Sequence, residues 1–276
     1  MRSVLALWWT QVRGQNRIFW RSPVSAFFTI VLPLVMLVLF VALFGNDTFD
    51  TPYGSVKVAQ FYTPGLAVFS AASATYTNIG INLAIRRDEG ILKRVRGTPL
   101  PPGIYLAGQV GSAVWIALLS VVLMVGVGVA AYGVEVEASS LGPLLAAFVA
   151  GTACFAVLGV ALAAAARSAA GAPAIANITI LPLAFVSQIF VSLGPERDTP
   201  AWLRLVGDVF PLKHFALLFG QAMTPGSGAS TVEWWRLGVL AAWAVVGAVF
   251  AWRRFVWEPR PGAATTRHRR RRTPAA

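Results

Sequence analysis

The residues best suited to bind a small molecule are uncharged polar side chains set inside long apolar stretches. Hydroxyl and amide groups can hydrogen-bond a ligand, but they transfer no proton at neutral pH. Their spacing groups them on helix faces, since positions 70, 73 and 77 share one face and positions 177 and 188, eleven residues apart, nearly eclipse one another. The candidate substrate-path residues are Ser70, Ser73, Thr77, Asn78, Asn177 and Gln188.

Two interpretations of these side chains stay open. Inside lipid, a polar group must face protein or a cavity. These residues therefore either line a path for a solute or hydrogen-bond neighbouring helices. Pro182, which lies between Asn177 and Gln188, is expected to kink its helix.

Residues suited to catalysis are scarce. The single cysteine, Cys154, excludes an intrachain disulfide and a cysteine-cluster metal site, and His214 and His268 both lie outside the apolar stretches. An intramembrane enzyme would need paired Asp, a Ser–His pair or a metal cluster within them. A secondary transporter would normally carry protonatable groups there and two related halves. The sequence favours neither class.

The sequence also lacks a nucleotide-binding loop. Such a loop requires a Gly-Lys pair to hold the phosphates, whereas the three lysines, Lys57, Lys93 and Lys213, follow valine or leucine. We therefore expect this chain to bind no cofactor and to hydrolyse no ATP.

Six apolar stretches contain these polar residues, and hydrophobic residues make up 57% of the chain. Each stretch is close to or above the ~20 residues that a helix needs to cross a bilayer. Arg236 is the only charged residue in any of them, as expected where a charge costs roughly 3 kcal/mol. The sequence predicts an all-α membrane protein with one transmembrane domain, residues 1–256, whose spans are 24–44, 61–85, 104–131, 142–166, 172–193 and 234–252.

The charges between these stretches indicate a topology. If the N-terminus is cytosolic, 18 of the 23 lysines and arginines lie in cytosolic segments, so both termini are expected in the cytosol. No cleaved leader is expected, because the first 23 residues hold four arginines and no signal-peptide core. Residues 257–276 are expected to be a disordered basic tail that favours anionic lipid over nucleic acid.

Three further segments are neither spans nor simple loops. Residues 2–21 form an amphipathic pattern typical of a helix lying in the membrane interface. Residues 86–98 predict a short, rigid cytosolic helix that Gly97 and the following prolines end. Segments 200–209 and 212–223 are apolar but too short to span, which suggests a hairpin dipping partway into the membrane from outside.

In this order the three segments resemble the type-2 ABC transporter permeases, which are six-span exporter subunits. The string from Glu89 to Leu100, EGILKRVRGTPL, resembles the family signature E-G-T-L-K-R-L-R-x-T-P-L. The string from Phe210 to His214 resembles the element N-P-L-T/x-H/Y, with Phe210 in place of asparagine. The likeness covers the chain except its basic tail.

The resemblance implies a permease dimer beside two copies of a separate ATP-binding cassette subunit, which binds the ATP and Mg. Homodimer and heterodimer both stay open, with the homodimer favoured. The ATPase-coupling residues would be Arg86, Arg87, Asp88, Glu89, Gly90, Leu92, Lys93, Arg94, Arg96 and Thr98. The outer gate would be Trp202, Phe210, Pro211, His214 and Phe215.

A path without charged groups suits an amphiphile, such as a hydrophobic drug, a natural product or a lipid-like molecule. The alternative is a polysaccharide or lipid-linked glycan exporter, for which Trp202, Phe210 and Phe215 would supply rings that stack on sugars. Arginine far exceeds lysine and alanine is abundant, which suggests a bacterial protein. We therefore expect it in the cytoplasmic membrane, in contact with lipid.

Overall fold

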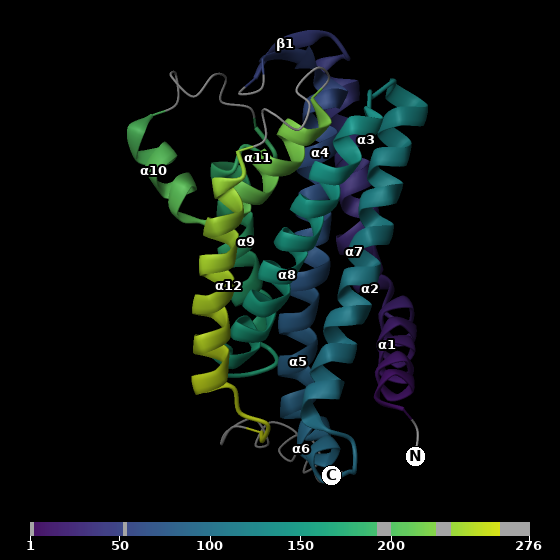
Figure 1. The fold of residues 1–276 in the computed structure, drawn as a ribbon, viewed down its shortest axis with the longest axis vertical. Coiled ribbons are helices and arrows are strands. Elements are labelled where there is room, and N and C mark those ends of the chain that lie inside the picture. Colours follow the sequence, from purple (N-terminus) through teal and green to yellow (C-terminus); the bar gives the residue numbers. More distant parts are fainter. Residues whose placement is uncertain (1–2, 52–53, 192–199, 225–232, 260–276) are drawn as a thin grey trace, which may run out of the picture.

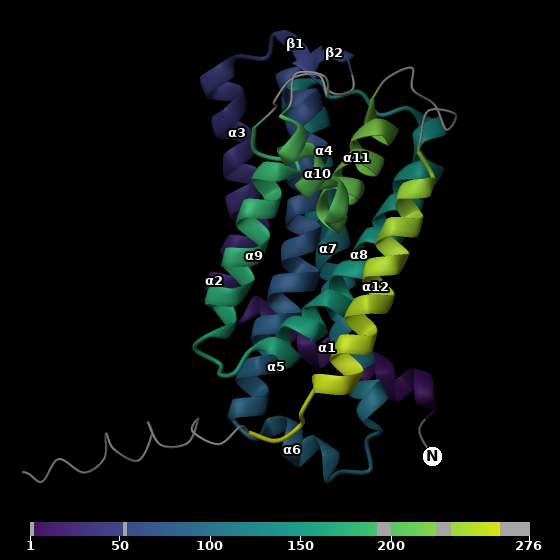
Figure 2. The same ribbon diagram turned by 90° about the vertical axis from the view of Figure 1, so that its left-hand side faces the viewer.

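Long helices run side by side along one axis and make up nearly all of the structure (Figures 1 and 2). The computed structural model describes residues 3–51, 54–191, 200–224 and 233–259. Within these residues, four helices are long and apolar enough to cross a membrane: Pro23–Phe44, Pro102–Tyr132, Ala138–Ala165 and Trp235–Arg254. The chain is therefore a multi-pass, mostly helical membrane protein.

These four helices have simple components. The first joins α2 (Pro23–Ala26), a π-helical turn η1 (Phe27–Val31) and α3 (Leu32–Phe44). The third joins the 3-10 turn η3 (Ala138–Ser140) to α8 (Leu141–Ala165), while α7 (Pro102–Tyr132) and α12 (Trp235–Arg254) are each single helices.

Two predicted spans take a different form. The second continues without a break from Val58 to Asp88, as α4 (Val58–Ala72), the π-helical turn η2 (Ser73–Thr77) and α5 (Asn78–Asp88). Its Ser, Thr and Asn residues make it less apolar than the four above. The fifth, α9 (Ala172–Val186), ends seven residues before position 193. The count of six spans therefore stays a prediction.

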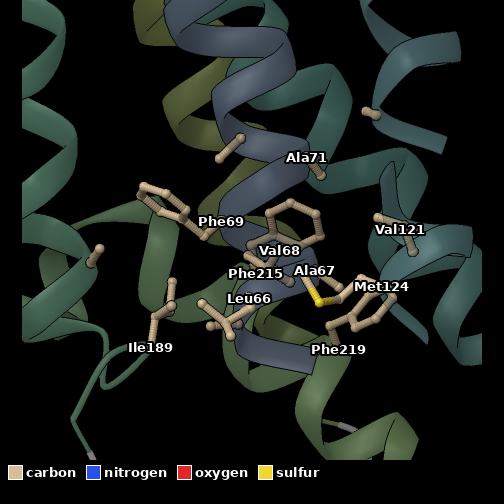
Figure 3. Packing of buried hydrophobic residues seen from close by; sticks show 14 of the residues in the cluster. Leu66, Ala67, Val68, Phe69, Ala71, Val121, Met124, Ile189, Phe215 and Phe219 are labelled. Atoms are coloured by element: carbon tan, nitrogen blue, oxygen red, sulfur yellow. The ribbon is translucent and has the colours of Figure 1, made fainter. Parts of the chain in front are cut away.

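The α4 helix is the centre of the bundle, because nearly every residue along it is buried. Leu66 of α4 shares one buried cluster with Met124 of α7 and Phe215 of α11, and their side chains crowd together in Figure 3. Glycine allows this approach, since a Cβ added to Gly151 of α8 would lie 2.5 Å from the Phe215 ring. In a membrane, such small residues let helices gain van der Waals contact.

Two short helices lie where the sequence places a hairpin. They are α10 (Ala201–Val209) and α11 (Pro211–Met223), and they are separated by Phe210, whose backbone is extended. Proline suits the first position of α11 because its missing N–H would have no helical partner there. The α11 helix is buried in the bundle, whereas α10 lies at its edge (Figure 1).

A small β-hairpin corrects the all-α expectation. Strands β1 (Thr48–Thr51) and β2 (Gly54–Lys57) pair antiparallel, with Thr48 opposite Lys57, at the end of the bundle where α3 passes into α4. Asn46 anchors the start of the hairpin. Its side chain donates to the Tyr132 carbonyl at 3.2 Å and accepts from the Ala59 N–H at 3.1 Å.

Two more short helices lie near the opposite end (Figure 1). The N-terminal helix α1 (Val4–Trp20) packs along α7, where Val12 and Phe19 are buried and the Trp8 indole donates to the Ala107 carbonyl at 3.1 Å. The chain turns sharply at Gly90, with φ 72°, between α5 and α6 (Ile91–Arg96). Only glycine adopts that backbone at little cost.

Candidate functional site

The candidate site begins with a cavity of about 520 Å³ between the first, second and fifth predicted spans, which we call the polar groove. No residue that lines it is charged. Four of the six predicted path residues lie on its wall, namely Ser73, Thr77, Asn78 and Asn177. Its other polar lining residues are Ser22, Ser25, Thr29 and Asn82.

Two π-helical turns flank the polar groove. Thr29 belongs to η1, and Ser73 and Thr77 bound η2. Ser70, the fifth predicted path residue, does not line the groove but donates to the Thr29 carbonyl at 2.7 Å, which ties α4 to η1. A π turn shifts the helical hydrogen-bond pattern and is frequent at functional sites.

The hydroxyl of Thr77 is a buried polar group of this wall that lacks a hydrogen-bond partner among the described residues. Its neighbours are paired: the Tyr76 hydroxyl lies 2.7 Å from that of Thr179, and the Asn82 amide donates to the side chain of Asn78. An unpaired buried hydroxyl costs free energy that a bound ligand can recover.

A second cavity of about 570 Å³ adjoins the first and shares Leu32, Phe69 and Leu181 with it. We call it the aromatic groove. Its rings lie close together, with centroids 4.6 Å apart for Phe40 and Tyr62 and 4.9 Å apart for Phe69 and Phe190. Phe44 and Phe185 complete its set of six rings.

The structure places the sixth predicted path residue, Gln188, away from both grooves. The expectation that it shares a helix face with Asn177 is wrong, because α9 ends at Val186 and Gln188 has a positive φ of 56°. The sequence also missed the aromatic groove. Its rings come from three separate helices and from the segment after α9, so no spacing within one helix could reveal them.

The predicted coupling segment divides into exposed and buried residues. Leu92 of α6 is fully buried, whereas its neighbours face outward. The exposed members are Glu89, Lys93, Arg94, Arg96 and Thr98. They are the predicted coupling side chains that are free to meet another protein.

Arg86, Arg87 and Asp88 contact this chain's own helices instead. Arg87 is only 1% exposed and donates to the carbonyls of Ala163 at 2.8 Å and Ala166 at 2.9 Å. Its guanidinium also lies 3.2 Å from Asp88, whose other oxygen accepts from the backbone N–H of residue 169 at 2.6 Å.

Arg86 is held in the same way. It donates to the Tyr105 hydroxyl at 2.8 Å and to the Gln109 side chain at 3.2 Å, both on α7. The expectation that Arg86, Arg87 and Asp88 themselves meet a partner is therefore corrected, because their hydrogen-bonding groups are engaged within the bundle.

The predicted outer-gate residues do not form one surface. Trp202 is exposed on α10, and the ring of Phe210 stacks on Trp243 with centroids 5.6 Å apart. Pro211 begins α11, while His214 and Phe215 are fully buried behind it. None of the five lines either groove, so a shared aromatic mouth at these positions is wrong.

His214 instead holds α10, α11 and α12 together. Arginine can only donate, so Arg236 donates to Nδ1 at 3.3 Å and Nε2–H donates to the Asp208 carbonyl at 2.8 Å. Lys213 pairs with Asp208 at 2.7 Å and Arg236 with Glu233 at 2.8 Å. Burial acts to raise the pKa of Glu233, but hydrogen bonds and the Arg236 charge outweigh it and lower the pKa.

The described residues hold no cluster of three His, Cys, Asp or Glu side chains that would bind a metal. Their arrangement can bind a molecule and present a surface to a partner. A bundle of membrane helices with an uncharged groove and a short basic helix at one end defines the membrane subunit of a transporter. Residues 5–223 match the family model of the ABC-2 type transporter, and the chain belongs to this family.

Two curated relatives agree with this family. The daunorubicin resistance ABC transporter permease protein DrrB1 of Streptomyces coeruleorubidus is 29% identical, over 84% of this chain and 79% of its own length. The putative transport permease ycf38 of Cyanophora paradoxa is 26% identical, over 70% of this chain and 66% of its own length. The resemblance to type-2 ABC permeases is thus confirmed. Membrane subunits of this family are transport components, and a separate ATP-binding cassette subunit hydrolyses ATP.

Proposed function

We propose that this chain is the permease subunit of an exporter that moves an amphiphilic drug, natural product or lipid-like molecule across a bacterial cytoplasmic membrane. Two copies of the chain form a homodimer beside two copies of the ATPase. Each copy crosses the membrane six times, with both termini and α6 in the cytosol, α1 in the inner interface and α10–α11 entering from outside. The segregation of lysine and arginine supports this topology.

The observation that carries the proposal is the change in chemistry along the two adjoining grooves. The polar groove offers hydroxyls and amides without a charge, including the unpaired hydroxyl of Thr77. The aromatic groove offers six rings, one of which is the phenol of Tyr62. A molecule with a polar, uncharged end and a planar or aliphatic body satisfies both, because each end meets groups of its own kind.

A glycan is less well served. Of the three rings expected to stack on sugars, Phe210 lies on Trp243 and Phe215 in the core, and only Trp202 is exposed. The aromatic groove has rings but few hydrogen-bonding groups, and sugar hydroxyls left unpaired there would cost free energy. We therefore favour the amphiphile.

In the proposed mechanism the ATPase binds α6 and the residues beside it. The contacting side chains are Glu89, Lys93, Arg94, Arg96 and Thr98. Arg87 and Asp88 are positioning residues, because they fasten the end of α5 to the end of α8 and to the loop before α9. Closure of the ATPase on nucleotide then moves these helix ends together as one body. The polar groove, between the first, second and fifth predicted spans, changes shape with them.

The test uses the permease reconstituted in vesicles with its ATPase. Uncharged amphiphiles are tried first, and daunorubicin, which the name of one relative mentions and which carries a protonated amine at neutral pH, is tried beside them. Thr77→Val is expected to raise the KM for stimulated ATP hydrolysis about tenfold, the worth of one hydrogen bond, with basal hydrolysis unchanged. Ser120→Ala is the matched control, since that hydroxyl is buried, bonds the Ile116 carbonyl and lies outside both grooves.

Two outcomes would contradict the proposal. One is a wild-type complex whose ATP hydrolysis responds to no amphiphile of any class. The other is a Thr77→Val variant with an unchanged KM for every substrate, which would mean that the hydroxyl of Thr77 does not meet a solute.

A further inference from the structure

The short segment after α12 returns to the coupling region. The Phe255 N–H bonds the Ala251 carbonyl at 2.8 Å, and its own backbone is extended, so the helix stops there. Residues 255–259 then run beneath the bundle toward α6, and both views place them beside it (Figures 1 and 2). The expectation of a disordered tail from residue 257 is therefore corrected for residues 257–259. We call residues 255–258 the C-terminal clasp.

Two aromatic rings of the clasp pack against a hydrophobic cluster to which α5, α6, α7 and α8 all contribute. Phe255 and Trp257 contact the cluster that contains Leu92, the fully buried residue of α6. Their ring centroids are 5.5 Å apart in an edge-to-face arrangement. A helix of six residues has little stability of its own, so the position of α6 depends on what Leu92 and its neighbours pack against.

The ion pair between clasp and helix adds little energy. Lys93 Nζ lies 3.9 Å from Glu258, and both side chains are more than half exposed. Water screens such an exposed pair, so it contributes little to stability. The pair shows that residue 258 lies beside α6, whereas the aromatic packing holds the clasp in place.

The outward surface around the clasp is basic. Lys93, Arg94 and Arg96 of α6 and Arg253 and Arg254 of α12 are all exposed, while the exposed acids beside them are Glu89 and Glu258. An acidic protein surface is the partner that this charge pattern fits. The sequence match to the family ends at residue 223, so the clasp lies outside it.

We propose that the C-terminal clasp and α6 together form one docking surface for an acidic face of the ATP-binding subunit, with Trp257 as the residue that positions α6. This rests on the proposed function, because it takes the ATPase as the partner. It extends the docking surface from one segment of the chain to two that are more than 150 residues apart.

The experiment measures association of the full-length permease with its ATPase, together with the ratio of substrate-stimulated to basal hydrolysis. Trp257→Ala is expected to weaken association about tenfold or more, as loss of a packed aromatic does at interfaces, and to bring the hydrolysis ratio close to one. Trp257→Phe is expected to restore both. Trp252→Ala is the matched control, because Trp252 lies in the last turn of α12, before the clasp, and is 84% exposed.

A second variant tests the surface without touching the packing. Arg253→Glu combined with Arg254→Glu is expected to weaken association, and added salt is expected to reduce the difference from wild type because it screens the charges. This variant decides the question if Trp257→Ala fails to fold.

The outcomes are distinct. A wild-type permease that does not associate with the ATPase contradicts the proposed function itself. A wild-type permease that associates, with a folded Trp257→Ala variant that does so equally well, overturns the docking role of the clasp. Charge reversal that weakens binding to anionic lipid vesicles but not to the ATPase also overturns it, because the membrane would then be the occupant.

Discussion

Arg87 links parts of the chain that are nearly eighty residues apart. Two of its three donated hydrogen bonds end on carbonyls at the C-terminus of α8, where the last turn has no helical donors left. The cation also lies at the negative end of the helix dipole, and Asp88 balances its charge. Burial of this guanidinium is therefore compensated on every side, which explains how a charged residue persists at 1% exposure.

Arg87→Met is expected to lower the stability of the bundle by about 3 kcal/mol, because it leaves Asp88 and two helix-end carbonyls without their partner. Thermal unfolding in detergent would measure the loss. Arg94→Met, which changes the same side chain at an exposed position of α6, should unfold as the wild type does. Equal melting temperatures for Arg87→Met and wild type would show that this cluster holds nothing in place.

The sequence predicted that the basic residues after the second span lie at the membrane surface, but it did not predict which of them are buried. A basic run beside a span satisfies the positive-inside rule whether its members face water or a helix end. Arg87 is buried because the carbonyls of Ala163 and Ala166 lie beside the end of α5, whereas Arg94 is exposed on α6. The position of those carbonyls is set by packing of residues far away in the chain. No local pattern carries that information. Ser73, Thr77, Asn78 and Asn177 line the polar groove, but the same spacing also selected Ser70 and Gln188, which do not.

At the scale of the helix, close packing between α8 and its neighbours depends on glycine. Gly151 leaves room for Phe215 of α11, and Gly159 lies where an added Cβ would be 2.7 Å from the Thr75 carbonyl in η2. The sequence predicts such contacts only as small residues in a span, without naming the partner. It also failed at the end of α9, because the apolar stretch resumes at Ile189 after the helix has ended, and apolarity alone does not distinguish helix from turn. The β-hairpin was also missed, because its strands have only four residues each and are too short to show a clear pattern.

Gly151→Ala is expected to destabilise the protein by about 1–3 kcal/mol, the usual cost of overpacking, because the new methyl group would overlap the Phe215 ring. Gly126→Ala on α7 provides the matched control, since nothing lies within 4 Å of its Cβ position. Alanine favours helix over glycine, so that variant should be as stable as wild type or slightly more. A chemical denaturation series would compare them, and equal losses in both would contradict this packing.

At the scale of the molecule, the two ends of the bundle differ in what they present. One end has the β-hairpin and the other has α6 and the clasp (Figure 2). The charge asymmetry of the sequence predicts which of these ends faces the cytosol, because the rule operates on counts of lysine and arginine and needs no contacts. The shape of the grooves between α3, α4 and α9 could not be predicted, since it depends on how three helices pack.

Single-cysteine variants test the proposed orientation. In a Cys154→Ala background, Thr98→Cys beside α6 should react with a membrane-impermeant thiol reagent only in inverted vesicles, and Thr48→Cys in β1 only in intact cells. Both threonines are exposed, so the reagent reaches either one once it is on the correct side. Labelling of both positions from the same side would contradict the orientation and the number of crossings between them.

The facing π turns, η1 and η2, have a consequence for how the cavity changes shape. A π turn accommodates one more residue than an α turn, and one residue corresponds to about 100° of rotation in an α-helix. If the hydrogen bonds of η2 return to the α-helical pattern, α5 rotates relative to α4. Different side chains then face the cavity. Such a change would replace hydroxyl groups by methyl groups on the cavity wall while the long helices keep their positions.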